Sequence, residues 1–339
     1  MLDRRTMMLT LASTALVGSL PALAASETVR IGQATTTLGF LSIWAARAFD
    51  TFAKQGLDLS WAAINGGDPA ALAALDSGDI DLAATGSDTV LEAVAKGQPY
   101  QIVYSLMSKM SLNLTVSTAF LKRTGAVKGQ PVGDRIRSLR DALIGVAVVG
   151  GAQDRTVRWL AKRGGLDPRK DIRVVQIGSA AALEAALENG AIDGFMLSAP
   201  EGEIAEAAGY GQIFIEPDVD FPDIHGMPSL VIVARQDANQ AAQAKIVASL
   251  RALNAGSRAL TDDLDGGAEL LRSKFFPKIS AEVMRRSVRS LANGIRDEGL
   301  LNQERAALLT KFVEESGRKP PEGSSFWTDR YLTSAKAPN

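Results

Sequence analysis

The sequence LDSGDID at residues 75–81 returns as LENGAID at residues 187–193. An Ala- and Leu-rich stretch precedes each copy, and an apolar stretch follows it. Each half then continues into an Ala- and Glu-rich run that closes at a glycine, Gly97 in the first and Gly209 in the second. Two similar α/β halves in one chain predict two lobes, and a cleft between lobes is where ligands bind.

Residues 1–24 have the pattern of a cleavable signal peptide. Arg4 and Arg5 precede an apolar segment at 7–20, and ALA at 22–24 fits an A-x-A cleavage site. The apolar segment is shorter than the roughly 20 residues that span a bilayer. The paired arginines fit both the general secretory and the twin-arginine route. We therefore expect a soluble, exported protein.

Composition excludes several classes of function. The chain has no Cys, which excludes a thiol nucleophile, a zinc–thiolate site, an iron–sulfur cluster and a lipid anchor on cysteine. It has 37 Lys and Arg against 38 Asp and Glu, a formal net charge of −1. This balance argues against nucleic acid or an anionic membrane as the main partner. We expect no bound metal or cofactor.

Strands and helices alternate in both halves. In the first half, apolar and alternating segments predict strands at 28–32, 57–63, 80–84 and 100–106. The second half repeats the pattern with strands at 144–148, 171–177, 192–196 and 212–215. Strands that alternate with helices favour parallel sheets covered by helices on both faces.

Two segments, 112–117 and 222–228, are expected to cross between the halves, the first leading into a polar, glycine-bearing loop. After Gln236 the chain turns helical, and we expect these helices to pack on the first lobe. We therefore predict an α/β fold of two parallel-type sheets joined by two crossing segments. Lobe I would comprise residues 25–110 and 226–339, and lobe II residues 111–225.

Four loops that follow predicted strands carry the candidate ligand contacts. In open parallel sheets ligands bind at the carboxyl ends of strands, where helix N-termini suit anions. Any one of these loops is explained equally well as a helix cap or turn, but four equivalent loops favour a shared cleft. The candidates are Thr36, Thr37, Leu38, Gly86, Ser87, Asp88, Gly151, Gln153, Asp154, Arg155, Ser198, Pro200 and Glu201.

Three of the candidate side chains have a second interpretation. His225, the only histidine, lies near the second crossing, and a structural role is favoured over a ligand contact. Arg155 would pair with an anionic ligand or with another helix. Glu201 is either a first-turn helix carboxylate or an acceptor for a ligand amine or ring N–H.

The sequence resembles a known family over nearly its whole length after residue 24. LDSGDID with Gly86 and Ser87 resembles the signature of periplasmic substrate-binding proteins of the nitrate/sulfonate/taurine type, a superfamily that includes binders of thiamine-pyrimidine precursors. IGVAV at 144–148 and the tail motifs FW at 326–327 and RYL at 330–332 resemble the same family.

This resemblance implies a two-lobed, type II periplasmic-binding-protein fold that closes on its ligand like a hinge. It also implies a monomer in the periplasm that delivers a small-molecule solute to the permease of an ABC importer in the inner membrane. The solute would be a sulfonate, nitrate or taurine-like molecule, or alternatively a pyrimidine or aromatic acid for an importer or a sensor. A periplasmic enzyme is the third hypothesis, for which His225 is the only imidazole base and no catalytic motif accompanies it.

Overall fold

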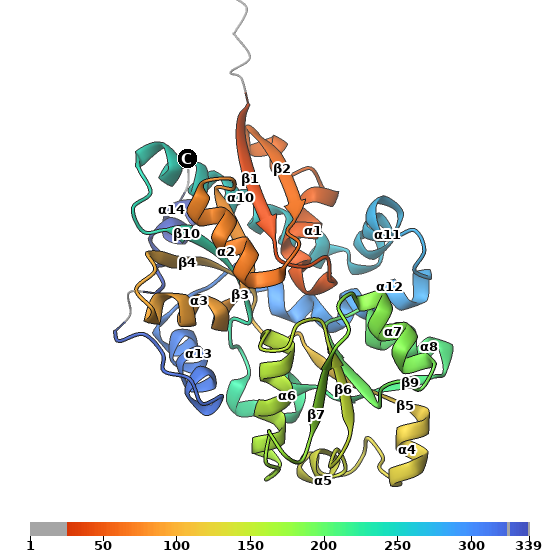
Figure 1. Cartoon of the computed structure of the whole chain (residues 1–339). Coiled ribbons are helices and arrows are strands. Elements are labelled where there is room, and N and C mark those ends of the chain that lie inside the picture. Colours follow the sequence, from red (N-terminus) through yellow and green to blue (C-terminus); the bar gives the residue numbers. More distant parts are fainter. Residues whose placement is uncertain (1–25, 324–325, 338–339) are drawn as a thin grey trace, which may run out of the picture.

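The structure, a computed structural model, describes residues 26–323 and 326–337, so the expected signal peptide at 1–24 lies outside the described residues. Two lobes stand one above the other in Figure 1, each built on a five-stranded sheet. We call the first sheet with its helices the first lobe (27–107 and 230–336) and the second sheet with its helices the second lobe (113–215). None of the described helices is both long and apolar enough to cross a membrane.

The first sheet has the strand order β2-β1-β3-β10-β4. β1 is parallel to both β2 and β3, whereas β10 is antiparallel to both of its neighbours. Its strands are β1 (Glu27–Gln33), β2 (Leu57–Ala63), β3 (Leu82–Gly86), β4 (Tyr100–Met107) and β10 (Leu230–Arg235).

The second sheet has the order β7-β6-β8-β5-β9 and the same pattern of directions. β6 is parallel to β7 and β8, and β5 is antiparallel to β8 and β9. Both sheets are therefore mixed, because the strand that arrives from the other lobe, β5 or β10, enters its new sheet from the opposite end. The strands are β5 (Asn113–Ser117), β6 (Leu143–Val146), β7 (Arg173–Gln176), β8 (Gly194–Leu197) and β9 (Gly211–Ile215).

Helices cover both sheets (Figure 1). Those of the first lobe are η1 (Leu38–Phe40), α1 (Leu41–Ala48), η2 (Ala53–Gln55), α2 (Gly67–Ser77), α3 (Ser87–Ala95), α10 (Gln240–Asp262), α11 (Leu264–Phe275), α12 (Ala281–Ala292), η4 (Asn293–Ile295), α13 (Gln303–Glu315) and α14 (Arg330–Lys336). The second lobe has α4 (Thr118–Thr124), α5 (Val132–Arg137), α6 (Ala152–Arg163), α7 (Ala180–Glu188) and α8 (Glu201–Ala208). The second crossing holds α9 (Pro217–Asp220) and η3 (Pro222–Ile224).

The repeated sequence ties each turn to the first parallel strand of its lobe. Asp81 Oδ2 accepts a hydrogen bond from Arg30 N in β1 at 2.7 Å, and Asp193 Oδ2 accepts one from Leu143 N in β6 at 2.9 Å. The last aspartate of each copy therefore fixes the register between the turn and the strand beside it.

The isoleucine of each copy packs over a glycine in the first parallel strand of its lobe. A Cβ on Gly32 of β1 would lie 2.7 Å from Ile80 Cδ1, and a Cβ on Gly145 of β6 would lie 2.8 Å from Ile192 Cδ1. Any larger residue would displace the isoleucine, since real Cβ atoms do not approach so closely. The sequence repeat is thus a repeat of core packing, which explains why it determines the architecture of both lobes.

The polar stretch after Ser117, expected to be a loop, contains the two short helices α4 and α5. Ser117 Oγ accepts a hydrogen bond from Phe120 N at 3.0 Å and so caps α4. Phe120 packs edge-on against Phe214 of β9, and Arg135 of α5 donates a hydrogen bond to the Phe214 carbonyl. These tertiary contacts stabilise helices too short to form alone.

Candidate ligand-binding site

A cavity of about 570 Å³ lies between the two lobes. The loop after each of the six parallel strands contributes to its wall, and ligands bind at this end of parallel strands. η1, the crossing segments, β10 and α13 complete the lining with Phe40, Met110, Ser111, Leu112, Met227, Ser229, Leu230 and Phe312. The wall from the strand ends comprises Ala34, Thr35, Thr37, 64–69, 86–89, 147–153, Arg155, Thr156, Gly178, Ser179 and Ser198.

The structure brings many of the sequence-predicted contact residues to this one cavity. They come from the loop after β1, the end of β3 and the start of α3 in the first lobe, and from the loop after β6, the start of α6 and the loop after β8 in the second. The candidates that line the cavity are Thr37, Gly86, Ser87, Asp88, Gly151, Gln153, Arg155 and Ser198.

Three other candidates lie beside the cavity without lining it. Thr36 is exposed, while Leu38 is buried in the first lobe and its N–H donates to Ala199 O across the lobes at 3.1 Å. Asp154 points back into its own loop, where its Oδ2 accepts a hydrogen bond from Gly150 N at 2.8 Å. Leu38 and Asp154 therefore support the wall of the cavity without lining it.

Pro200 and Glu201 are buried at the start of α8, outside the lining. Glu201 is 7% exposed. Burial, with the nearby carboxylates of Glu184 and Glu203, raises its pKa to about 8, so Glu201 is mostly protonated at neutral pH. Its Oε2 has no hydrogen-bond partner in the described part of the chain.

His225 lies on the surface of the second crossing segment. Its side chain is 69% exposed, and Nδ1 lies 3.2 Å from Asp218 Oδ2. It is not among the residues that line the cavity.

Several lining residues were not predicted from the sequence. Asn65 belongs to the loop after β2 and Asp68 to the first turn of α2, which this loop leads into. The loop follows a parallel strand as the predicted loops do, so the same rule points to it. Thr89 follows Asp88 in the first turn of α3. Phe312 comes from α13, whose sequence indicates a buried face but not the surface that this face meets.

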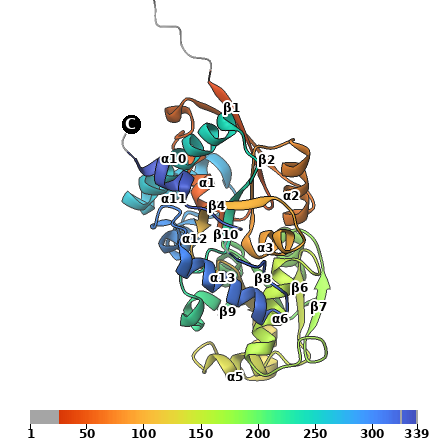
Figure 2. The same cartoon turned by 90° about the vertical axis from the view of Figure 1, so that its left-hand side faces the viewer.

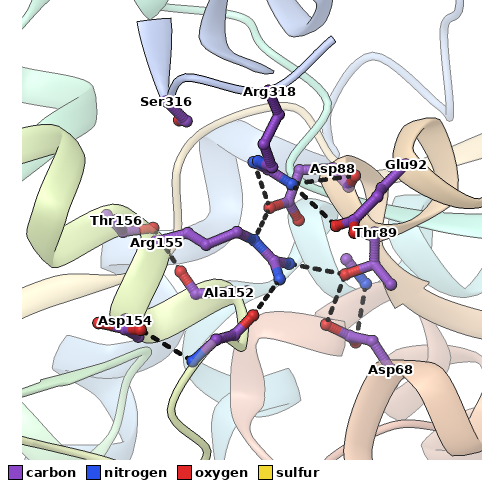
Figure 3. Close-up of polar contacts among 12 residues, drawn as sticks. Asp68, Asp88, Thr89, Glu92, Ala152, Asp154, Arg155, Thr156, Ser316 and Arg318 are labelled. Carbon is purple, nitrogen blue, oxygen red and sulfur yellow. Dashed lines mark hydrogen bonds and ion pairs between the residues drawn. The ribbon is translucent and has the colours of Figure 1, made fainter. Parts of the chain in front are cut away.

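Arg155 of α6 links the two lobes (Figure 3). Its Nε donates to Asp88 Oδ2 at 2.5 Å, and its Nη2 donates to Thr89 Oγ1 at 2.7 Å, both on α3. Its Nη1 donates to Gly150 O in its own lobe at 2.6 Å. The guanidinium therefore spans the cleft.

Asp88 is the centre of this ion cluster. It is 6% exposed, and Arg318, which follows α13, donates through Nη2 to the same Oδ2 at 3.0 Å. Burial would raise the pKa of Asp88, but the positive charges of Arg155 and Arg318 outweigh it and hold the pKa below its ordinary value. Asp88 is therefore ionised at neutral pH.

Asp68 extends the network along the wall of the first lobe. Its Oδ1 accepts hydrogen bonds from Thr85 Oγ1 at 2.8 Å and Gly86 N at 3.0 Å. Its Oδ2 accepts one from Thr89 Oγ1 at 3.3 Å. Asp68 and Thr89 thus join Arg155 in one continuous polar chain, as Figure 3 shows.

At the inner end of the cavity the lobes meet through small polar groups. Ser111 Oγ of the first crossing segment and Ser198 Oγ of the second lobe lie 2.9 Å apart and share a hydrogen bond. A Cβ on Gly39 would lie 3.0 Å from Ser198 Oγ, so the glycine permits this close approach. Within the described residues no group of three His, Asp or Glu side chains is arranged to hold a metal ion.

Solved structures share this fold. The ligand-binding component of an ABC-type import system from Staphylococcus aureus has a TM-score of 0.70 and 18% identity, over 91% of this chain and 99% of that one. The periplasmic nitrate-binding protein NrtA from Synechocystis PCC 6803 has a TM-score of 0.68 and 16% identity, over 91% and 88%. The periplasmic aliphatic sulphonate binding protein SsuA from Escherichia coli has a TM-score of 0.63 and 18% identity, over 85% and 86%.

At these identities the likeness shows the fold alone. No curated protein sequence matches this chain. The model of the NMT1-like family matches residues 24–269, which include both sheets and the cavity-lining loops of both lobes. The chain belongs to the NMT1-like family.

Proposed function

We propose that this protein is the solute-binding component of an ABC importer and that it binds a small organic solute in the cavity between its lobes. The observation that carries the proposal is that the ends of all six parallel strands, from two separate sheets, meet at one cavity. A ligand held by both lobes stabilises the closed arrangement, which is the signal that a permease needs.

The location of the protein in the cell and its partner follow from the same proposal. The pattern of residues 1–24 supports export to the periplasm, and the named relatives that are periplasmic support it too. We propose that residues 25–110 and 226–339 form one lobe and 111–225 the other, in a monomer that docks on an inner-membrane permease. The position of His225, exposed and outside the lining, supports a binding protein over a hydrolase.

Sulfonates, nitrate and taurine are the first solutes to consider, because two solved relatives are named for sulphonate and nitrate. A cavity of about 570 Å³ falls within the roughly 300–1,000 Å³ of sites for organic ligands and exceeds what a bare inorganic oxyanion fills. Pyrimidines and aromatic acids are the second candidate, supported by the apolar and aromatic part of the lining.

A thermal-shift screen with two mouth-blocking variants tests the proposal. Ligand at 100 times its Kd stabilises the folded state by about 2.7 kcal/mol. The panel contains alkanesulfonates, taurine, nitrate, carboxylates, aromatic acids and pyrimidines. Val149→Trp and Asn65→Trp, on exposed lining residues of opposite lobes, should both abolish the shift of any hit.

Val127→Trp is the matched control, since Val127 is 57% exposed in the second lobe and does not line the cavity. It should leave the shift unchanged. A hit whose shift survives both mouth variants would place binding elsewhere and overturn the proposal.

A further inference from the structure

The charges that line the cavity constrain the charge of the solute. Among the described lining residues, Arg155 is the sole Lys or Arg, whereas Asp68 and Asp88 both contribute carboxylates. Three nitrogens of Arg155 already donate to Asp88, Thr89 and Gly150. The guanidinium is thus engaged by the protein itself and serves as a link between lobes.

The helix N-termini at the cavity do not supply the missing positive charge. α2, α3 and α6 all begin at its wall, and a helix N-terminus carries a partial positive charge. Each of these helices, however, has an aspartate in its first turn, respectively Asp68, Asp88 and Asp154. Asp88 is paired with Arg155 and Arg318, and Asp154 with Arg158 at 2.8 Å, so with Asp68 the three aspartates balance the three arginines and leave no excess positive charge. Burying a solute anion without a counter-charge is strongly unfavourable.

The two oxygens of Asp88 have different surroundings. Oδ2 accepts hydrogen bonds from Arg155 and Arg318, whereas Oδ1 accepts none in the part of the chain that the structure describes. A Cβ built on Gly86, itself a lining residue, would lie 3.3 Å from Oδ1. Asp88 itself lines the cavity, so its Oδ1 is the carboxylate acceptor left for a solute, and a charge-assisted hydrogen bond to it would be strong.

A second requirement comes from the apolar part of the lining. This part comprises Phe40, Met110, Leu112, Met227, Leu230 and Phe312. Methionine and aromatic side chains adapt to flat or irregular apolar groups. A solute that fits both walls has an apolar body and at least one hydrogen-bond donor.

We propose that the solute is an organic molecule without net negative charge, neutral or zwitterionic, whose N–H or O–H donor binds Oδ1 of Asp88 and whose apolar body packs on Met227 and Phe312. This inference rests on the proposed function and adds the charge class of the solute. Of the solutes considered above it keeps zwitterionic taurine and neutral pyrimidines, and it sets aside nitrate, alkanesulfonates and ionised aromatic acids. Asp88 is then the residue that determines specificity, because its carboxylate both engages Arg155 and faces the solute.

Size-matched pairs of probes test the charge class. The protein is unfolded and refolded to remove bound solute, and calorimetry then gives Kd for benzamide against benzoate and for benzenesulfonamide against benzenesulfonate. The neutral member of each pair should bind at least tenfold more tightly. In Asp88→Asn the freed guanidinium groups should shift the preference toward the anion by at least tenfold. Tighter binding of the anions by the unaltered protein would overturn the inference.

Asp58→Asn is the matched control, because it removes the same charge from an exposed position of the first lobe outside the lining. It should keep the preference of the unaltered protein. If Asp88→Asn does not fold, the unaltered protein still decides the question through a second measurement. Native mass spectrometry identifies what the refolded protein captures from yeast extract.

The captured solute separates failure of the inference from failure of the proposed function. A neutral or zwitterionic solute supports the inference, and a net anionic solute overturns it while leaving the proposed function intact. Absence of any captured solute together with no binding of all four probes would count against the proposed function and, with it, the inference.

Discussion

Trp159 Nε1 of α6 donates a hydrogen bond to Glu315 Oε2 of α13 at 2.9 Å, which joins the second lobe to a C-terminal helix of the first. Arg163 adds two hydrogen bonds to the same oxygen, and the Trp159 ring packs against Phe312. Figure 2 shows α13 beside α6. Since Phe312 also lines the cavity, α13 contributes both to the candidate ligand site and to the contact between the lobes.

Trp159→Phe should loosen this contact. The change removes one buried hydrogen bond and part of a ring that is 1% exposed, and we expect a loss of about 2 kcal/mol in the free energy of unfolding. Small-angle scattering should show a larger radius of gyration without ligand. Trp61→Phe removes a comparable bond, to Gln33 within the first lobe, and should lower stability without changing the radius. Equal radii for the two variants would contradict a role for Trp159 in lobe contact.

The position of α13 marks the limit of prediction from the sequence. The sequence predicts strand β2 at 57–63, as the structure has it, because the alternation of buried and exposed positions along a strand is visible in neighbouring residues. Helical periodicity likewise indicates the buried face of 303–316. It does not say that α13 meets both α3 and α6, because that depends on residues far away in the chain.

The directions of β5 and β10 in their sheets cannot be predicted from the sequence for a similar reason. A strand buried on both faces has the same apolar pattern whether it runs parallel or antiparallel to its neighbours.

The ion cluster is a third feature that the sequence does not predict. Asp88 and Arg155 were both candidates, but their pairing depends on how the lobes face each other, and Arg318 gave no local signal.

Arg155→Ala should destabilise the folded protein in a pH-dependent way. Removing one partner of a buried ion pair costs about 3 kcal/mol, and Asp88 would keep only Arg318. The folded-state pKa of Asp88 is lowered, so its stabilisation is present above the unfolded value of about 3.9 and is lost as the pH falls through the folded value. Urea unfolding should show a large difference at pH 7 that shrinks below about pH 4.

The control for this change is Arg137→Ala, since the side chain of Arg137 is 60% exposed and pairs with Asp134 on the same helix. Exposed pairs contribute little, so we expect less than about 1 kcal/mol at either pH. A pH-independent loss in Arg155→Ala would mean that packing, and not the charge of Asp88, dominates at this position.

Glu201→Gln should flatten the decline of stability toward alkaline pH. The pKa of Glu201 is raised to about 8 by burial, above the unfolded value of about 4.3. The folded chain therefore binds more protons between these values, and stability falls by up to about 1.4 kcal/mol per pH unit as the pH rises. Glutamine removes this dependence, which urea unfolding between pH 5 and 8 would measure. Exposed Glu304→Gln should leave the slope as it is.

Gly39→Ala should hold the lobes apart. Gly39 is buried where η1 of the first lobe meets β10, the first crossing segment and the second lobe. An added Cβ would lie 3.0 Å from Leu230 Cδ1, 3.0 Å from Ser198 Oγ and 3.2 Å from Ser111 Oγ. Overpacking of this kind costs about 1–3 kcal/mol when the neighbours cannot move. Here the lobes can separate, so we expect only part of that loss in unfolding free energy, together with weaker ligand binding and a larger radius of gyration.

Gly129→Ala is the matched control, because a Cβ at Gly129 meets no described atom within 4 Å and its φ is not in the left-handed region. It should change neither radius nor affinity, and it should slightly stabilise the chain by reducing the freedom of the unfolded state. If Gly39→Ala instead lowers stability fully while the radius and affinity stay unchanged, the Ser111–Ser198 contact is rigid. The lobes would then be held as a fixed unit at this end of the cavity.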